Sequence, residues 1–426
     1  MRTLLYVLVF ATSAMLVSAA NMDPVYEWKY IDYVWESDAR RQQAIDSGEY
    51  DFSRILPMDV DKAPDGRIFI STLGMHGVPA SLVIVTDQMG PSGPLVKPYP
   101  DWSYFKTENC DSIQNVYRIA IDECERLWVL DTGFLEGERI TCEPQLLAFD
   151  LKTDRLIERI KIPNHIARGS NGQTMLATPI VETIGQKCEN TTVFMADPMG
   201  KGLVIWNGVR LFRLENPLFG PTPGAENITS GNFTVNWPDT GIVTMDLSPK
   251  IFPGEQSFLY FHALSSLDLY AASTEVLKRS THGMAIKFLG SKNVLSSQAI
   301  GVAFSSEGTL FLGMTKESAI ACWNKYRDLT SYNIEIVAQD SHSLEYVNGL
   351  KVIRVPHSRD EEVWALSNRF IAFQLGQLDA NDYNFRVLKG SVKKLITGTS
   401  CELPRKTQNA LESINRGEES VLIVTD

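Results

Sequence analysis

The sequence predicts an all-β fold, a six-bladed β-propeller that forms a single domain. The first observation is a recurring short apolar strand with an aromatic residue near its start, clearest in Arg126–Gly133, RLWVLDTG. Related stretches follow one another at intervals of 51 to 66 residues, and their aromatic residues are Phe69, Trp128, Phe194, Tyr260, Phe311 and Trp364. Repeats that cannot each bury their own sheet face alone are typical of propeller blades.

The second observation is a further apolar strand that follows each repeat after 9 to 21 residues. These strands are expected to end at Val85, Phe149, Trp206, Tyr270, Trp323 and Phe373. Turn residues precede several repeats, as in Pro64-Asp65-Gly66. The expected blades are residues 55–97, 116–163, 178–215, 241–288, 298–339 and 344–396. We expect the six recurring aromatic residues to form the innermost core.

Residues 21–54, which precede the first blade, are rich in aromatic and charged side chains. The stretch EWKYIDYVW alternates in a way that suits a strand, and a short helix is expected around Ser37–Ser47. We expect the first strand to pair with the last blade, because closing the ring leaves no exposed sheet edge. The propeller is therefore predicted to span residues 21–401.

Both ends of the chain are predicted to lie outside the propeller. Arg2 precedes an apolar run over residues 4–17 and small residues at 18–20, which indicates a secretory signal peptide over residues 1–20. The apolar run is too short for a membrane anchor. Residues 402–426 are mostly polar, and we expect a disordered tail there.

Charge and hydropathy restrict the partners. The chain has 40 basic and 51 acidic residues and a net charge of −11, without the basic stripe that nucleic-acid binding needs. Cationic small molecules and basic proteins are electrostatically permitted. Beyond residue 20 no apolar run is long enough to span a bilayer, so neither nucleic acid nor membrane is an expected partner. The sequence leaves the oligomeric state open.

Six cysteines follow the signal peptide, namely Cys110, Cys124, Cys142, Cys188, Cys322 and Cys401. An even number in a secreted chain favours disulfides, and no CxxC pair indicates zinc. We expect Cys110 to pair with Cys142 across the RLWVLDTG strand, and Cys322 to pair with Cys401 at the end of the last blade. Cys124 and Cys188 precede equivalent strands of adjacent blades, so they can form a third disulfide with each other. The alternative is that both are buried free thiols.

The segment between blades three and four, residues 216–239, is rich in Pro and Gly and is predicted to be a long surface loop. It contains the glycosylation sequons that begin at Asn227 and Asn232, and a third sequon begins at Asn190. In a secreted chain these asparagines are expected to carry glycans.

The sequence contains no recognisable catalytic constellation. The histidines form no HExxH motif, and GxSxG, GxGxxG and a phosphate-binding glycine loop are missing. Asp59, Asp131 and Asp197 stand at strand ends, where a propeller can hold calcium, but their spacing marks no cage and we interpret them as turn caps. The sequence therefore predicts no catalytic residue, no metal and no cofactor.

A resemblance rests on ordered blocks from about Glu27 to Glu402. These are EWKYIDY, RRQQAIDSGEYD, GVPASL, LVKPYPDWSYF, ERLWVLDTG, QLLAFDLKT, MADPMGKGLVIW, AIACWNKYR and the ending NFRVLKGSVKKLI with TSCE. They resemble the insect major royal jelly protein and Yellow family, and LVKPYPDWS and SGEYD are closer to the royal jelly branch. The resemblance implies a secreted, glycosylated six-bladed propeller.

The resemblance also implies three classes of function. We favour a secreted glycoprotein of the royal jelly type that acts as a nutrient, an extracellular carrier or a signal without catalysis. The alternatives are a Yellow-type dopachrome-converting enzyme of melanin pigmentation, which needs a general base near the channel, and a biogenic-amine scavenger.

The amine-binding members of the family hold their ligand in the central channel, and Asn368 and Phe370 in SNRF match that site. Asn368 offers an acceptor to an ammonium or catechol group, and Phe370 offers an aromatic face to a cation. The preceding strand, LKVIRV, lacks the hydroxyl that helps those binders. The resemblance thus implies a small amine, catechol or sterol-like ligand. The alternative is that Phe370 belongs to the blade-six core and Asn368 caps a turn.

Overall fold

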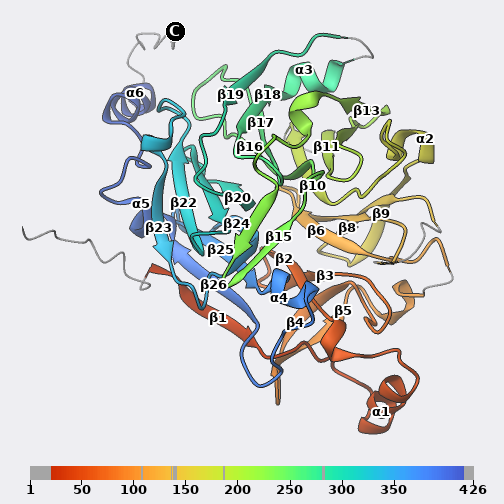
Figure 1. The fold of residues 1–426 in the computed structure, drawn as a ribbon. Coiled ribbons are helices and arrows are strands. Elements are labelled where there is room, and N and C mark those ends of the chain that lie inside the picture. The colour runs from red at the N-terminus through yellow and green to blue at the C-terminus, as the bar shows by residue number, and fades with distance from the viewer. Residues whose placement is uncertain are drawn as a thin grey trace, which may run out of the picture.

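The computed structural model describes residues 21–106, 109–135, 137, 142–185, 188–280 and 284–416. Six four-stranded antiparallel sheets surround one axis and form a single-domain propeller (Figure 1), which confirms the predicted fold class. Within the described ranges, no helix is both long and apolar enough to cross a membrane.

The first three blades follow chain order. Their strands are β2 (Pro57–Lys62), β3 (Ile68–Thr72), β4 (Leu82–Gly90) and β5 (Gly93–Pro98), then β6 (Val116–Ile121), β7 (Arg126–Asp131), β8 (Gln145–Asp150) and β9 (Arg155–Lys161), then β10 (Thr178–Ile184), β11 (Asn190–Asp197), β12 (Gly202–Trp206) and β13 (Leu211–Glu215).

An inserted hairpin and the last three blades come next. The strands are β14 (Asn227–Ser230) and β15 (Phe233–Asn236), then β16 (Ile242–Leu247), β17 (Phe258–Ala263), β18 (Leu269–Ser273) and β19 (Phe288–Ser291), then β20 (Ala299–Phe304), β21 (Thr309–Met314), β22 (Ala319–Asn324) and β23 (Glu335–Gln339), and finally β24 (Tyr346–Arg354), β25 (Glu361–Asn368), β26 (Phe385–Ser391) and the N-terminal β1 (Asp23–Trp28).

Short helices lie between these strands or follow the last of them. They are α1 (Asp38–Asp46), α2 (Asn164–Ala167), α3 (Thr274–Arg279), α4 (Phe370–Gln374), α5 (Val392–Ile396), α6 (Arg405–Asn415) and the 3-10 turns η2 (Phe52–Arg54), η3 (Trp102–Tyr104), η4 (Pro217–Phe219) and η5 (Ser331–Asn333). The expected first helix is confirmed as α1, whose N-cap residue Ser37 accepts a hydrogen bond from the backbone N–H of Arg40.

The ring closes as expected, with β1 pairing antiparallel to β26 in the order β1-β26-β25-β24. Trp28 at the end of β1 is fully buried, and its indole N–H donates to the carbonyl of Pro94 at 2.7 Å. The N-terminal strand therefore completes blade six and also contacts the outer strand of blade one.

The second strand of each blade carries the recurring aromatic residue. These strands read as continuous apolar runs because neighbouring blades cover both of their faces, and every residue of β3 and β21 is buried. The outer strand β9, for example, contains no buried residue and has a weaker apolar pattern. This difference explains why the second strands gave the clearest signal in the sequence.

The expectation that these aromatic residues belong to the core is confirmed for five of the six, which are buried, but they lie between blades and not at the axis. Phe69 lies in an apolar cluster with residues of blade two, Phe194 with residues of blade four, and Trp364 with residues of blade one. Tyr260 is only partly buried. Each ring thus fills the space between its own blade and the next, because adjacent sheets diverge away from the axis and leave room there for large side chains.

Two elements near the C-terminus also differ from the predictions. Phe373 lies in helix α4, and the third strand of blade six is β26 instead. Residues 405–415 of the expected disordered tail form α6, in which Thr407, Ala410, Leu411 and Ile414 are buried or half-buried. Their i, i+3, i+4, i+7 spacing is that of an amphipathic helix. The predicted signal peptide and residues 417–426 lie outside the described residues.

Three disulfides hold neighbouring segments together, and their pairings are those expected from the sequence. The Cα atoms are 5.4 Å apart in Cys110–Cys142, 6.3 Å in Cys124–Cys188 and 5.9 Å in Cys322–Cys401. The second bridge, left open by the sequence, joins blades two and three. The third ties the exit of blade six to β22 of blade five.

Candidate functional site

The first strands of the six blades line a chamber on the propeller axis. Its volume is about 330 Å³, and strands β2, β6, β10, β16, β20 and β24 all contribute side chains. The residues that line it are Asp61, Arg118, Ala120, Ile121, Glu123, Thr178, Ile180, Val181, Thr244, Met245, Asp246, Leu247, Val302, Ala303, Phe304, Leu350, Lys351 and Val352. A chamber of this size can hold one small organic molecule.

Two carboxylates, Asp61 and Asp246, face this chamber from blades one and four, which are opposite in a ring of six. Asp61 Oδ2 accepts a hydrogen bond from the N–H of Ile121 at 2.9 Å, and Asp246 Oδ2 accepts one from Phe304 at 2.6 Å. Each carboxylate therefore joins its own inner strand to that of the next blade. Among the described residues, neither has an ion-pair partner.

Burial raises the pKa of both carboxylates. The low-dielectric surroundings disfavour the ionised form, and they raise the pKa of Asp61 to about 6 and that of Asp246 to about 6. The charge of Lys351 and hydrogen bonds from backbone N–H groups oppose this increase. The chamber therefore gains or loses negative charge close to neutral pH.

The two basic groups of the chamber are already engaged. Lys351 Nζ lies 2.9 Å from Asp59 Oδ2 and donates to the carbonyl of Ile119 at 2.8 Å. Arg118 donates to the carbonyls of Asn348 at 2.5 Å and Ile300 at 2.9 Å. Burial lowers the pKa of Arg118, whereas for Lys351 the carboxylates outweigh burial and raise the pKa. Lys351 is therefore ion-paired, whereas Arg118 is held by neutral oxygens and keeps its positive charge in a chamber that also holds Asp61 and Asp246.

The inserted hairpin covers the other end of the axis. Residues 216–239 were predicted to be a loop, but they include β14 and β15, which lie across the middle of the ring in Figure 1. Ser230 Oγ donates to the carbonyl of Glu345 at 2.8 Å, and Gln298 Nε2 donates to that of Ala225 at 2.7 Å. Ile228 of the hairpin packs with Ile300 in one apolar cluster. This end of the axis is therefore closed.

The structure brings Asn368 and Phe370 together at the closed end. Asn368 is 1% exposed; its Nδ2 donates to the carbonyl of Pro57 at 2.7 Å, and its Oδ1 accepts from the N–H of Phe370 at 3.1 Å. The Phe370 ring stacks on Tyr346 at 5.4 Å and meets Trp237 edge-on at 5.7 Å. These contacts agree with the alternative of a turn cap and a packed ring. A ligand-binding role for the pair stays a prediction.

The strand-end aspartates have structural partners. Asp131 Oδ1 accepts from the N–H groups of Gln114, Asn115 and Gly133 and so caps turns, as expected. Asp59 instead pairs with Lys351 and with the inner strand of blade two, so the interpretation as a turn cap is wrong there. In the part of the chain that the structure describes, no group of three His, Cys, Asp or Glu residues is arranged to hold a metal.

The three sequon asparagines, Asn190, Asn227 and Asn232, are all exposed. Asn227 Oδ1 accepts a hydrogen bond from Asn236 Nδ2 at 2.9 Å across the hairpin, and Asn232 lies at its turn. Two of the three sites are therefore on the hairpin that closes the axis. Glycosylation stays a prediction.

The inner-strand charges were missed in the sequence. The segments VYRIAI and VTMDL each place one charged residue in a mainly apolar strand, and MDVDK and GLKVIR intersperse charged residues with apolar ones. That pattern is the signal that could have found Asp61, Arg118, Asp246 and Lys351. It is informative because a charge within a buried strand needs a partner or a function.

The fold and the site together define a class: a ring-closed six-bladed propeller with an axial chamber, closed at one end and acidic within. Residues 114–401 match the family described as Major royal jelly protein. The chain is 38% identical over 390 residues to Major royal jelly protein 9 of Apis mellifera, an alignment that covers 89% of this chain and 90% of that protein.

Two further relatives from Apis mellifera belong to the same family. Major royal jelly protein 8 is 38% identical over 401 residues, covering 90% of this chain and 94% of the relative. Major royal jelly protein 1 is 35% identical over 393 residues, covering 89% of each chain. The chain belongs to the major royal jelly protein family, which confirms the resemblance seen in the sequence.

Proposed function

We propose that this chain is a secreted glycoprotein of the royal jelly type that acts without catalysis, as a nutrient, an extracellular carrier or a signal. Of these three roles the axial chamber best supports the carrier, with a small organic amine as its ligand. The observation that carries this proposal is that two carboxylates, the buried Asp61 and the half-buried Asp246, face one chamber without an ion-pair partner among the described residues. Secretion is supported by three disulfides and by the signal-like residues 1–20.

The chamber suits an amine for two physical reasons. An ammonium group between Asp61 and Asp246 neutralises charge that the fold leaves uncompensated, and this attraction is strong where water is excluded. The apolar side chains of Ile180, Leu350 and Val352 can contact the hydrocarbon part of the ligand. Because the hairpin closes one end, the ligand enters past the exposed Glu123 at the other.

Calorimetry with secreted recombinant protein tests the carrier function. We expect serotonin and dopamine to bind, and Asp246→Asn to weaken binding at least about tenfold, since a hydrogen bond to a charged group contributes roughly 1.5–3 kcal/mol. The matched control is Asp23→Asn, which removes an exposed carboxylate from the outer strand of blade six. Equal affinity in wild type and Asp246→Asn contradicts the proposal.

The same carboxylates favour one second candidate, conversion of dopachrome. A carboxylate whose pKa lies near 6 can accept a proton at neutral pH, so Asp61 and Asp246 meet the requirement for a general base. A spectrophotometric dopachrome assay separates the two functions. Turnover that is lost in Asp61→Asn or Asp246→Asn supports the enzyme, whereas amine binding without turnover supports the carrier.

A further inference from the structure

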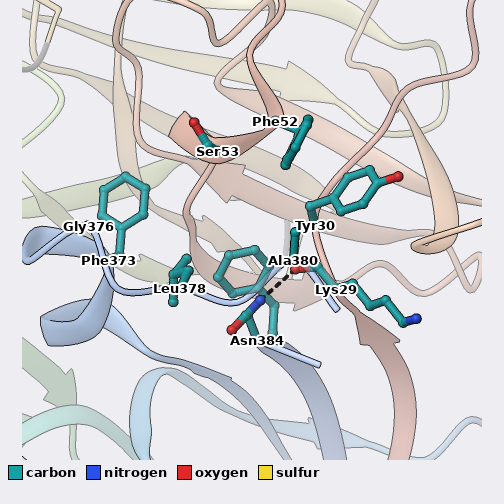
Figure 2. A pocket seen from close by; sticks show the side chains of 10 residues that line it. Lys29, Tyr30, Phe52, Ser53, Phe373, Gly376, Leu378, Ala380 and Asn384 are labelled. Atoms are coloured by element: carbon teal, nitrogen blue, oxygen red, sulfur yellow. Dashed lines mark hydrogen bonds between the residues drawn. The ribbon is translucent and has the colours of Figure 1, made fainter. Parts of the chain in front are cut away.

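A second pocket lies away from the axis, where the start of the chain meets the segment between α4 and β26. It has a volume of about 200 Å³ and is lined by Lys29, Tyr30, Phe52, Ser53, Phe373, Gly376, Leu378, Ala380, Asn384 and Phe385. Figure 2 shows the side chains of Phe52, Phe373 and Leu378 around a common space. None of these residues lines the axial chamber.

The walls of this pocket are held by hydrogen bonds. Asn384 donates its backbone N–H to the carbonyl of Trp28 at 2.9 Å, and its Nδ2 donates to the carbonyls of Lys29 at 2.8 Å and Asp379 at 2.7 Å. Arg369 Nη1 fixes the same segment through Asp382 Oδ2 at 2.9 Å. The pocket is therefore formed before any ligand arrives, so little ordering opposes binding.

The lining is aromatic and almost free of unpaired polar groups. Tyr30 and Phe52 contact each other with ring centroids 4.5 Å apart, and the Phe385 ring is buried. The Ser53 hydroxyl donates to Asp51, and the Asn384 amide is engaged as described. Among the described residues that line the pocket, Lys29 alone is charged, and its ammonium lies 5.9 Å from the Tyr383 ring. This chemistry suits an uncharged aromatic ligand.

Large apolar side chains are exposed at the lining residue Phe52 and at Leu375 and Tyr383, which adjoin the lining residues Gly376 and Asn384 in the chain. Phe52 and Tyr383 are each 40% exposed, and Leu375 is 48% exposed. Grouped exposure of this kind, around a concave site, marks a binding surface. A cavity of roughly 150 Å³ with apolar walls takes benzene, so about 200 Å³ accommodates one ring with one or two small substituents.

We propose that this peripheral pocket binds an uncharged, single-ring aromatic compound. The proposal is independent of amine binding on the axis, because the two sites share no lining residue. It requires that aromatic walls distinguish a flat ring from a saturated ring of the same size, since ring contacts add to the free energy of simple burial.

The test is calorimetry on the full secreted chain with p-cresol, and with 4-methylcyclohexanol as the saturated ring of similar size. We expect saturable binding of p-cresol and binding of 4-methylcyclohexanol that is several-fold weaker. Ala380→Phe places a ring in the pocket from an exposed position and should weaken the binding of p-cresol at least about tenfold. Ala39→Phe, an exposed position on α1, is the matched control and should leave the affinity unchanged.

A second variant keeps the test decisive if Ala380→Phe perturbs the fold. Phe52→Ser removes a partly exposed ring from the wall of the pocket and should also weaken the binding of p-cresol. Unchanged affinity in a folded Ala380→Phe and in Phe52→Ser overturns the proposal, and so does equal affinity for the two rings. The proposal is also overturned if wild type does not bind p-cresol but forms a concentration-dependent dimer that Ala380→Phe abolishes. That result assigns the surface to self-association.

Discussion

The two ends of the propeller axis differ in chemistry although the same six inner strands build both. At one end, near Ile300 and Tyr346, the strands carry apolar side chains that pack with the hairpin β14–β15 and helix α4. Further along the same strands, Asp61 and Asp246 face a chamber without an ion-pair partner among the described residues. One end of the axis is built for stability, and the other retains charges that reduce stability.

This difference shows where to look for function in the molecule. The closed end satisfies its polar groups, as Asn368 does with both ends of its amide. The chamber holds the buried Asp61 and the half-buried Asp246, whose charges cost folding free energy unless a ligand or a proton neutralises them. The residues that reduce stability are therefore the better candidates for binding than the pair at the closed end.

The largest expected effect concerns the closed end. Tyr346→Ala removes a buried ring that stacks on Phe370, so we expect the free energy of unfolding to fall by about 3–5 kcal/mol. Thermal unfolding followed by circular dichroism measures it. The control Tyr332→Ala truncates a ring that is 91% exposed and should change stability by less than about 0.5 kcal/mol. Similar losses in both variants would mean that the hairpin end contributes no specific packing.

The chamber should respond in the opposite direction. Asp246→Asn removes the charge of a half-buried group and keeps an oxygen for the N–H of Phe304, but it loses the acceptor for the N–H of Leu247, so at pH 7.5 we expect stability to rise by no more than about 1 kcal/mol. Urea unfolding of the two proteins side by side measures the difference. A clear loss of stability in Asp246→Asn would show that the charge is already compensated in the fold.

The pH dependence of stability sharpens the same point. Because the folded-state pKa of Asp61 and Asp246 is raised from 3.8 to about 6, ionisation opposes folding in full above pH 6, and this penalty decreases as the pH falls from about 6 towards 3.8. When the pH is lowered from 7.5 to 5, the free energy of unfolding of wild type should therefore rise relative to that of the Asp61→Asn, Asp246→Asn double variant. Parallel curves for the two proteins would contradict the raised pKa values.

Glycans offer the smallest effect. Asn227→Gln and Asn232→Gln alter exposed positions on the hairpin, so each should remove one glycan from the secreted protein and change unfolding free energy by less than about 0.5 kcal/mol. Intact mass spectrometry reports the glycans. An unchanged mass after either substitution would show that the site is not used.

The fold was predictable from the sequence, whereas the chamber was not. RLWVLDTG and its relatives lie in second strands that are buried on both faces, so their apolar runs stand out. Inner strands contain register shifts, such as those between Ile242 and Thr244 and between Val347 and Gly349, which change the face that each side chain occupies. Which charges face the axis thus depends on contacts between strands far apart in the chain, and the sequence alone does not give them.

The pairings Cys110–Cys142 and Cys322–Cys401 were predicted from the sequence, whereas Cys124–Cys188, which lies next to equivalent strands of adjacent blades, was left open. The hairpin was not predicted, since Pro and Gly in residues 216–239 mask two strands of four residues each. Asn368 and Phe370 were found through resemblance, and the structure places them at the closed end of the axis. Their predicted role needs a channel that the hairpin covers.

The most direct test of the account is the number of protons released when an amine binds. Near pH 6 Asp61 and Asp246 are each about half protonated, and an ammonium beside them should expel those protons. Calorimetric titration with serotonin at pH 6, in buffers of different ionisation enthalpy, measures the release. We expect between about 0.5 and 1 proton per serotonin in wild type, and less in Asp246→Asn. Serotonin binding without proton release, or with equal release in both proteins, would contradict the assignment of the chamber as the amine site.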